Sequence, residues 1–265
     1  MVYITRRAML AASALVATPA FADPPSLTWR TLAPGLDHGQ ARIASRIGDR
    51  QLHIARIDPA HFRFHLLTAA GTHSARKTAR QWAQQNQCVA AINAAMFRPN
   101  GLPVGFAKAD GHIIQPQRNS DRSMFVFDAE SARLLDLSGD TFAESEHDNA
   151  LQGIRMISSE GRNVWSQQPR SWSIAALAST SDGRILFLHA RSPLSVHDFI
   201  AAIQSLPLNL ASAMYLEGGP EATLYLNAGG AEIERVGSYE TGFNENDDNV
   251  AAWPLPNVIG VVPRS

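Results

Sequence analysis

The sequence predicts an α+β protein in which a large mixed β-sheet forms the core and a few helices pack against it. Short apolar runs bounded by Gly, Pro or Asp-Gly recur along the chain and are typical of strands. Only two longer stretches place apolar residues at helical spacing. The chain shows no internal repeat and no low-complexity segment. Strands should therefore outnumber helices, as in α+β folds with a large sheet.

The N-terminal residues 1–22 are predicted to form a signal peptide. A basic pair, Arg6-Arg7, precedes an apolar stretch at 8–17 that is too short to span a bilayer. Ala20-Phe21-Ala22 is a small-x-small cleavage signature. Residues 5–10 resemble a twin-arginine signal, and an ordinary secretory signal with two chance arginines is the alternative. We expect cleavage near Ala22-Asp23 and a periplasmic or secreted protein.

The remaining residues 23–265 are predicted to form a single domain, long enough to bury a substantial core. Cys88 is the only cysteine, so no internal disulfide can form, and its apolar surroundings are typical of an inert core residue. Loss of Arg6 and Arg7 leaves 21 of the 23 basic residues against 24 acidic ones. This balance argues against a nucleic-acid partner. No later run of eighteen apolar residues predicts a membrane span, and the oligomeric state is left open.

Each strand is predicted from apolar residues that alternate or run between turn residues. Residues 23–40 are interrupted by Pro and Gly and should form a loop or an edge, and the polar residues 138–150 should form a surface loop. The predicted strands cover residues 51–57, 62–67, 88–92, 104–109, 112–114, 123–127, 133–137, 154–157, 172–178, 184–188, 213–216, 222–226 and 257–262.

Two helices are predicted, and the second belongs to a β-α-β crossover near residues 184–217. The first covers 74–87, with Trp82 on its apolar face, and the second begins at Ser195, whose hydroxyl can cap the first turn. A strand–helix–strand unit is almost always a right-handed crossover with parallel strands. Ligands bind at the carboxyl ends of such strands. The crossover would therefore place His189, Arg191 and Glu217 at one sheet edge, with Asn93 at an equivalent strand end.

Glu217 is the strongest candidate functional residue. It follows a buried strand and precedes Gly218-Gly219-Pro220. A carboxylate at the end of a core strand is costly unless it has a partner or faces a ligand site, and glycines allow a ligand to come close. Glu217 could be a general acid or base, or could fix a sugar hydroxyl; a structural carboxylate that caps loop amides is the alternative. Glu221 either flanks the same site or is a solvated loop acid.

Other polar residues are weaker candidates from local pattern. Asn93 can both donate and accept, which suits a sugar or a phosphate oxygen, and a strand-end turn residue is the alternative. Arg170 suits bidentate phosphate recognition, and a surface arginine is the alternative. His112 and His189 are more often structural residues than ligands. The nine histidines show no metal-ligand spacing, so no metal and no cofactor is predicted, although a divalent cation stays open. No GxSxG, P-loop or GxGxxG motif is present.

Three stretches resemble the phosphodiester glycosidase family, whose members include bacterial relatives of the lysosomal uncovering enzyme. Ala91-Ile-Asn-Ala-Ala-Met-Phe97 with Gly101-Leu-Pro-Val-Gly105 is similar to the family's Asn-Gly-Gly-Phe-Phe and Pro-x-Gly. Pro169-Arg-Ser-Trp-Ser-Ile174 with Asp182-Gly183 is similar to its Arg-Thr-Ala strand and turn. Met214-Tyr-Leu-Glu-Gly-Gly-Pro-Glu-Ala222 is similar to its Leu-Asp-Gly-Gly-x-Ser. The resemblance extends from about residue 50 to 262.

The resemblance implies hydrolysis at the anomeric carbon of a sugar 1-phosphodiester. It implies Glu217, Arg170 and Asn93 as catalytic residues, with Arg170 on the departing phosphate and Glu217 steering water or stabilising the oxocarbenium-like state. The substrate-binding residues expected around them are Gly218, Gly219, Glu221, Gly105, His189 and Arg191. The partner would be a glycan or sugar 1-phosphodiester, in exopolysaccharide or envelope glycan metabolism.

Departures from the family pattern keep a second interpretation open. The family's glycines are Ala94 and Ala95 here, and its aspartate is Glu217. These changes could mark a non-catalytic periplasmic glycan-binding or polysaccharide-assembly protein that uses the same cleft. A metal-dependent phosphodiesterase that cuts the phosphate side is a third, weaker interpretation.

Overall fold

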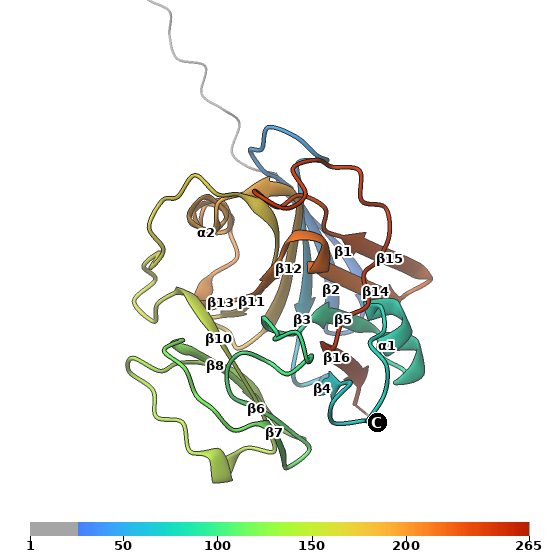
Figure 1. Ribbon diagram of the computed structural model, residues 1–265, viewed down its shortest axis with the longest axis vertical. Coiled ribbons are helices and arrows are strands. Elements are labelled where there is room, and N and C mark those ends of the chain that lie inside the picture. Colours follow the sequence, from blue (N-terminus) through green and yellow to red (C-terminus); the bar gives the residue numbers. More distant parts are fainter. Residues whose placement is uncertain (1–25, 265) are drawn as a thin grey trace, which may run out of the picture.

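Two antiparallel β-sheets pack face to face in the computed structural model, which describes residues 26–264 (Figure 1). The larger sheet has eleven strands, in the order β1-β2-β3-β12-β11-β13-β10-β6-β7, with β8 paired to β10 and β9 to β8. The smaller sheet has five strands in the order β15-β14-β5-β16-β4. The prediction of a mostly β protein with few helices is confirmed.

The strands have the following bounds. The larger sheet contains β1 (Leu27–Ala33), β2 (Leu36–Arg42), β3 (Gln51–Ile57), β6 (Ala107–Ala109), β7 (His112–Gln115), β8 (Ser123–Phe127), β9 (Ala132–Asp136), β10 (Asn149–Ile157), β11 (Trp172–Thr180), β12 (Ile185–Leu194) and β13 (Leu210–Gly218). The smaller sheet contains β4 (Phe62–Thr68), β5 (Ala90–Asn93), β14 (Thr223–Ala228), β15 (Ala231–Val236) and β16 (Asn257–Pro263).

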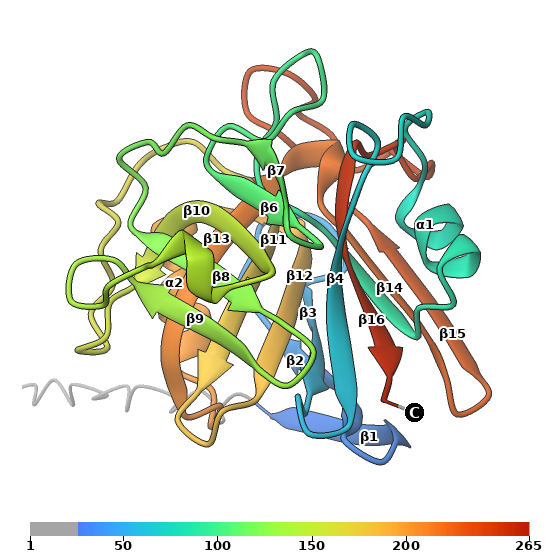
Figure 2. The ribbon, with the colours of Figure 1, turned by 90° about the horizontal axis from the view of Figure 1, so that it is seen from below.

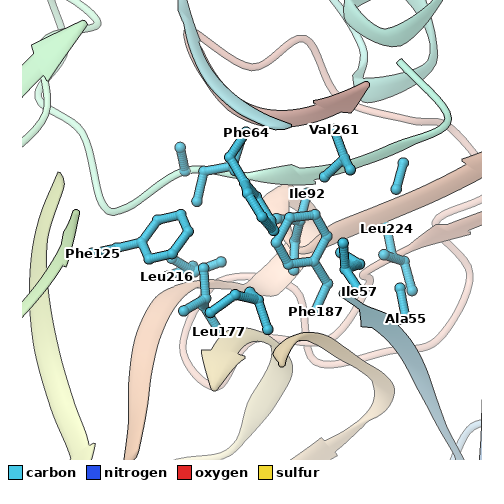
Figure 3. Packing of buried hydrophobic residues seen from close by; sticks show 14 of the residues in the cluster. Ala55, Ile57, Phe64, Ile92, Phe125, Leu177, Phe187, Leu216, Leu224 and Val261 are labelled. Carbon is cyan, nitrogen blue, oxygen red and sulfur yellow. The ribbon is translucent and has the colours of Figure 1, made fainter. Parts of the chain in front are cut away.

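The main hydrophobic core lies between the two sheets (Figure 3). Strict alternation along β4 turns Phe62, Phe64 and Leu66 into it, because successive side chains of a strand point to opposite faces. The Phe64 ring packs edge-on against Phe187 of β12, with ring centroids 6.1 Å apart. Leu216 of β13 is fully buried in the same core. Its burial fixes the position of the next residue, Glu217.

One helix covers the outer face of each sheet, and Figure 2 shows them on opposite sides of the molecule. α2 (Val196–Gln204) packs Phe199, Ile200 and Ile203 onto the larger sheet, and its start at Ser195 confirms the prediction. α1 (Ala79–Gln85) packs Trp82 onto the smaller sheet. The predicted helix 74–87 is too long, because Thr78 forms a capping box with Gln81 and the backbone of Lys77 pairs with Leu255 instead.

Strand pairing differs from the prediction of a mixed sheet with a β-α-β crossover. Every pairing between named strands in the described part of the chain is antiparallel. β12 and β13, the strands on either side of α2, are not neighbours, because β11 lies between them and pairs with both. β12 and β13 both run antiparallel to β11 and hence in the same direction as each other, but they share no hydrogen bonds, and the predicted β-α-β crossover in a mixed sheet is not confirmed.

Several element boundaries also move. The strand predicted at 184–188 continues to Leu194, so His189 and Arg191 lie within it rather than at its end. Asn93 does end its strand, but that strand, β5, belongs to the smaller sheet. Residues 23–40, expected as a loop or an edge, contribute β1 and most of β2, and β1 is the outermost strand of its sheet. The predicted signal peptide lies outside the described residues. Between residues 26 and 264, neither helix is long and apolar enough to cross a membrane.

Candidate functional site: a cluster of three glutamates

Three glutamates from two separate parts of the chain meet at the end of β13. Glu217 is the next-to-last residue of β13, and the short 3-10 turn η2 (Gly219–Glu221) places Glu221 four residues further on. Glu240 comes from the loop after β15 and pairs with Trp172 in an isolated β-bridge. The charges of Glu221 and Glu240 both act on Glu217, and that of Glu240 acts on Glu221. We call these three residues the glutamate cluster.

Glycines allow the chain segments of the cluster to approach closely. Gly219 has a φ of +66°, in the left-handed region that favours glycine, and a Cβ on it would lie 2.5 Å from Glu240 Oε2. A Cβ on Gly218 would lie 2.5 Å from the Tyr215 hydroxyl oxygen and 2.7 Å from Trp172 Nε1. Gly218 and Gly219 therefore form the surface against which Glu240, Tyr215 and Trp172 pack.

Backbone hydrogen bonds fix the loop that carries Glu240 to the start of β11. The Ser173 N–H donates to the Tyr239 carbonyl, and the Thr241 N–H donates to the Ser171 carbonyl. Arg191 braces the far side of this loop. Its guanidinium donates to the carbonyls of Val236 and Asp247 and forms an ion pair of 2.8 Å with the Asp247 carboxylate. Arg191 thus holds the loop that positions the third glutamate.

Burial and mutual repulsion raise the pKa values of the three glutamates above that of a free glutamate. Desolvation, with smaller contributions from the Glu221 and Glu240 charges, raises the pKa of Glu217 to about 8, against a hydrogen bond of 3.0 Å from the Gly218 N–H. Desolvation also raises the pKa of Glu221 and of Glu240, while the charges of Arg76 and Arg170 respectively oppose these shifts. At neutral pH Glu217 therefore carries a proton, while the nearby arginine charges favour the ionised forms of Glu221 and Glu240.

Arg170 connects the cluster to a large open groove. Its side chain is exposed, and its positive charge acts on Glu240. Arg170, Ser171 and Tyr239 line one part of a groove of about 580 Å³, whose other wall includes Arg46 and Ser195. A groove of this volume fits the size range of small-molecule sites. Because Arg170 lies beside Glu240 and also lines the groove, it can contact both the cluster and a ligand bound in the groove.

Two buried hydrogen-bond donors near the cluster have no partner in the described structure. The Asn93 Oδ1 accepts from the Thr223 N–H at 2.9 Å, two residues beyond Glu221, but its Nδ2 is buried and unpaired. The indole Nε1 of Trp172 is likewise buried and has no hydrogen-bond partner by distance and angle, although it lies close to the Tyr215 hydroxyl. Unpaired buried donors are costly, so they mark positions where a ligand oxygen would be stabilising.

The two alanines that replace family glycines lie beside the same strand end. Ala94 and Ala95 are almost fully buried, and Ala95 keeps a φ of +47°, a conformation that glycine adopts at less cost. Ala95 and Met96 line a small hollow with Gly105 and Tyr215. Gly105 is therefore connected to the cluster through Tyr215, whose hydroxyl lies next to Gly218.

His189 lies in the core rather than at the surface of the site. It is fully buried, and its Nε2 bonds the carbonyl of Ala222, the residue after Glu221, at 3.2 Å. Since a carbonyl can only accept, Nε2 carries the proton. Desolvation lowers the pKa of His189 to about 4, so the ring is neutral at pH 7. This hydrogen bond supports the backbone next to Glu221.

Sequence reasoning missed Glu240, Tyr215 and Trp172. Glu240 follows no buried strand, and its approach to Glu217 depends on the pairing of residues 239–241 with 171–173. Tyr215 and Trp172 lie in predicted strands, and both are strand residues in the structure, so nothing in the sequence set them apart. The one signal for a close approach of this loop was Gly237, because a Cβ at that position would collide with the Gly219 backbone. Within residues 26–264, no group of three His, Cys, Asp or Glu side chains is arranged to hold a metal ion.

A known protein family matches most of the chain. The sequence model of the phosphodiester glycosidase family matches residues 86–262, a range that contains all three glutamates, Asn93 and Arg170. No curated protein sequence matches the chain.

Solved structures share the fold at low sequence identity. The zebrafish N-acetylglucosamine-1-phosphodiester alpha-N-acetylglucosaminidase catalytic domain, auto-inhibited by its pro-peptide, has a TM-score of 0.62 and 13% identity, with 92% of this chain and 85% of that chain covered. A Synechocystis protein has a TM-score of 0.60 and 16% identity, with 91% and 64% covered. A Burkholderia pseudomallei protein has a TM-score of 0.52 and 11% identity, with 85% and 74% covered.

Proposed function

Because the chain belongs to the phosphodiester glycosidase family, we propose that it is an exported hydrolase that releases a sugar from a sugar 1-phosphodiester. The glutamate cluster carries this proposal. A carboxyl group with a pKa of about 8, next to two carboxyl groups whose ionisation is favoured by arginine charges, can provide an acid and a base in one site. Paired carboxyl groups of this kind are what glycoside hydrolysis requires.

In the proposed reaction the bond between the anomeric carbon and the phosphate oxygen breaks. The phosphate oxygen keeps the bonding electron pair and takes the proton of Glu217, and a phosphate monoester leaves. Water forms the new bond to the anomeric carbon and gives its proton to Glu221 or Glu240. The products are a free sugar and the phosphate monoester. Transfer of one proton from Glu221 or Glu240 back to Glu217 restores the starting state. Glu217 thus acts as a general acid, because it is protonated at neutral pH.

The remaining site residues fit the two halves of the substrate. Arg170 would neutralise the departing phosphate, and the groove beside it would take the group beyond the phosphate. The unpaired Nδ2 of Asn93 would donate to a sugar hydroxyl. An exported enzyme of this specificity would act on exopolysaccharide or envelope glycans that contain sugar phosphodiesters.

The direct test is turnover of a panel of UDP-sugars and aryl sugar phosphodiesters in water enriched in ¹⁸O. We expect release of free sugar, with the label on the anomeric carbon. Label in the phosphate would show cleavage of the phosphorus–oxygen bond and would support the phosphodiesterase alternative. Glycan binding without turnover of any substrate would support the non-catalytic glycan-binding alternative, for which the strained Ala95 in place of a family glycine is the specific observation.

The pH dependence should follow the proton on Glu217. Its folded-state pKa of about 8 means that the acid form is present below this pH and is lost above it. We expect kcat/KM for a sugar phosphodiester to fall as the pH rises through about 8, because this constant reports the free enzyme. The measurement is a rate profile from pH 5 to 10 at constant ionic strength. A profile that stays level to pH 10 would exclude Glu217 as the acid.

Arg170 should matter only when the leaving group is a phosphate. Replacing Arg170 with alanine should lower kcat/KM for sugar phosphodiesters by roughly 10–100-fold, the usual effect of losing one charge-assisted hydrogen bond. Hydrolysis of an aryl glycoside without phosphate should change little. Arg162→Ala, which removes an arginine with a 76% exposed side chain from the preceding loop, is the matched control and should leave both rates unchanged. Equal losses on both substrates would contradict the assigned role.

A further inference from the structure

A second polar hollow lies between the outermost strands of the two sheets, apart from the glutamate cluster. β1 and β2 form one wall and β15 forms the other, and Figure 1 shows β15 beside β1. The hollow has a volume of about 260 Å³ and is lined by Thr28, Arg30, His38, Gln40 and Arg235, among others. Arg30 and His38 are direct partners across the β1–β2 ladder, so their positions are fixed by the sheet.

The hollow contains two arginines that have no acidic partner. Neither Arg30 nor Arg235 forms an ion pair with a carboxylate in residues 26–264. The acids next to the lining residues in sequence are engaged elsewhere: Asp37 pairs with Arg56, Glu234 with Arg80, and Glu232 accepts from the Tyr225 hydroxyl. Two guanidinium groups therefore face one hollow without a counter-charge.

Buried histidines hold Arg235 in place and add a neutral donor. Arg235 Nε donates to His53 Nε2 at 3.0 Å, so the proton of the neutral His53 ring is on Nδ1. That Nδ1–H lies 3.1 Å from His38 Nε2 and donates to it, which places the proton of His38 on its own Nδ1. His38 is only 6% exposed. Burial and the charges of Arg235 and Arg30 lower the pKa of His38, so the ring stays neutral at pH 7.

The lining thus offers charged donors from Arg30 and from the rest of the Arg235 guanidinium, whose Nε and Nη1 donate to His53 and to the Glu234 carbonyl, and neutral donors from His38 and Gln40, but no acid. We propose that this hollow is a second binding site, specific for a phosphate group, either free or carried by a sugar. Arginine matches phosphate oxygens with bidentate hydrogen bonds, and a phosphate accepts at every exposed oxygen. The site is separate from the glutamate cluster and does not depend on catalysis.

Isothermal titration with inorganic phosphate, glucose 1-phosphate and acetate tests the proposal on the full mature chain. Phosphate should bind, and acetate should bind at least tenfold more weakly. Arg30→Gln should weaken phosphate binding by about tenfold or more, the effect of one charged hydrogen bond, without a change in melting temperature, because Arg30 is exposed. Arg42→Gln is the matched control: it removes the same charge from an exposed position on β2, outside the hollow, and should change affinity less than twofold.

The comparison of probes identifies the form of the ligand. Tighter binding of glucose 1-phosphate than of inorganic phosphate would support a sugar phosphate, and equal affinities would support a bare phosphate site. The proposal is overturned if the wild type does not bind phosphate, or if Arg30→Gln and Arg42→Gln behave alike. It is also overturned if Arg170→Gln abolishes phosphate binding and Arg30→Gln does not, since the anion would then occupy the groove beside the glutamate cluster.

Discussion

Replacing Glu217 with glutamine should lower kcat for a sugar phosphodiester by about 10²–10⁴-fold, the usual contribution of a general acid. Glutamine has nearly the shape of the protonated carboxyl group, which is the form that the site favours at neutral pH. It cannot give up a proton to the phosphate oxygen. Binding of substrate should therefore persist while turnover is lost, and steady-state kinetics together with titration of the inactive variant would separate the two effects.

The same variant should be more stable than the wild type at pH 8. Burial raises the pKa of Glu217 from 4.5 to about 8 on folding, so the stabilisation from binding this proton is complete below pH 4.5 and is lost as the pH rises to 8. Glutamine does not titrate and escapes this loss. Denaturant unfolding at pH 8 should show a gain on the order of 1–3 kcal/mol, which disappears at pH 4.

An exposed glutamate provides the control for both measurements. Glu130, whose side chain is 85% exposed, loses the same negative charge in Glu130→Gln. Its activity and its stability should match the wild type at both pH values. If Glu217→Gln keeps full activity, or if its gain in stability is the same at pH 4 and pH 8, then Glu217 is not the buried acid of the site.

A methyl group on Gly218 should disrupt the site from within. In Gly218→Ala the new Cβ would lie 2.5 Å from the Tyr215 hydroxyl oxygen and 2.7 Å from Trp172 Nε1, which is closer than such atoms can pack. Both rings must shift, and overpacking of this kind typically costs about 1–3 kcal/mol of stability. Because the rings contact the segments that carry Glu217 and Glu240, we expect kcat/KM to fall at least tenfold, measured beside thermal unfolding.

Gly139→Ala is the matched control for this substitution. A Cβ on Gly139 would meet no atom within 4 Å, and its φ is not in the left-handed region. This variant should unfold and react as the wild type does. Wild-type behaviour of Gly218→Ala would mean that Tyr215 and Trp172 can move away freely, and that their packing does not position the glutamates.

The features of the fold and the site that depend on residues close together in the sequence can be predicted from it. Alternating burial along β4 and the apolar run before Glu217 are visible in the residues themselves, and so are Ser195 as a helix cap and Gly218-Gly219 as a close approach. Each depends on neighbours within a few positions. The strand positions and the first two glutamates of the cluster follow from such patterns.

The remaining features depend on contacts between residues that are far apart in the sequence. β11 inserts between β12 and β13, although nothing in residues 184–217 indicates a third strand. Glu240 reaches Glu217 only because its loop pairs with residues 171–173. His189 ends a predicted strand but continues a real one, since it pairs with His53, more than a hundred positions earlier. Local periodicity carries no information about such pairings.

The crowding of three acids also determines which charge is favourable beside them. Each carboxyl group raises the energy of ionising the next, so a positive charge placed among them would favour their ionised forms and release a proton. A cationic sugar mimic would relieve that repulsion, and its binding would be coupled to proton release and would strengthen with rising pH. Under the proposed function, an iminosugar-type inhibitor would fit this cluster, because it carries the charge that a reacting sugar develops only in its transition state.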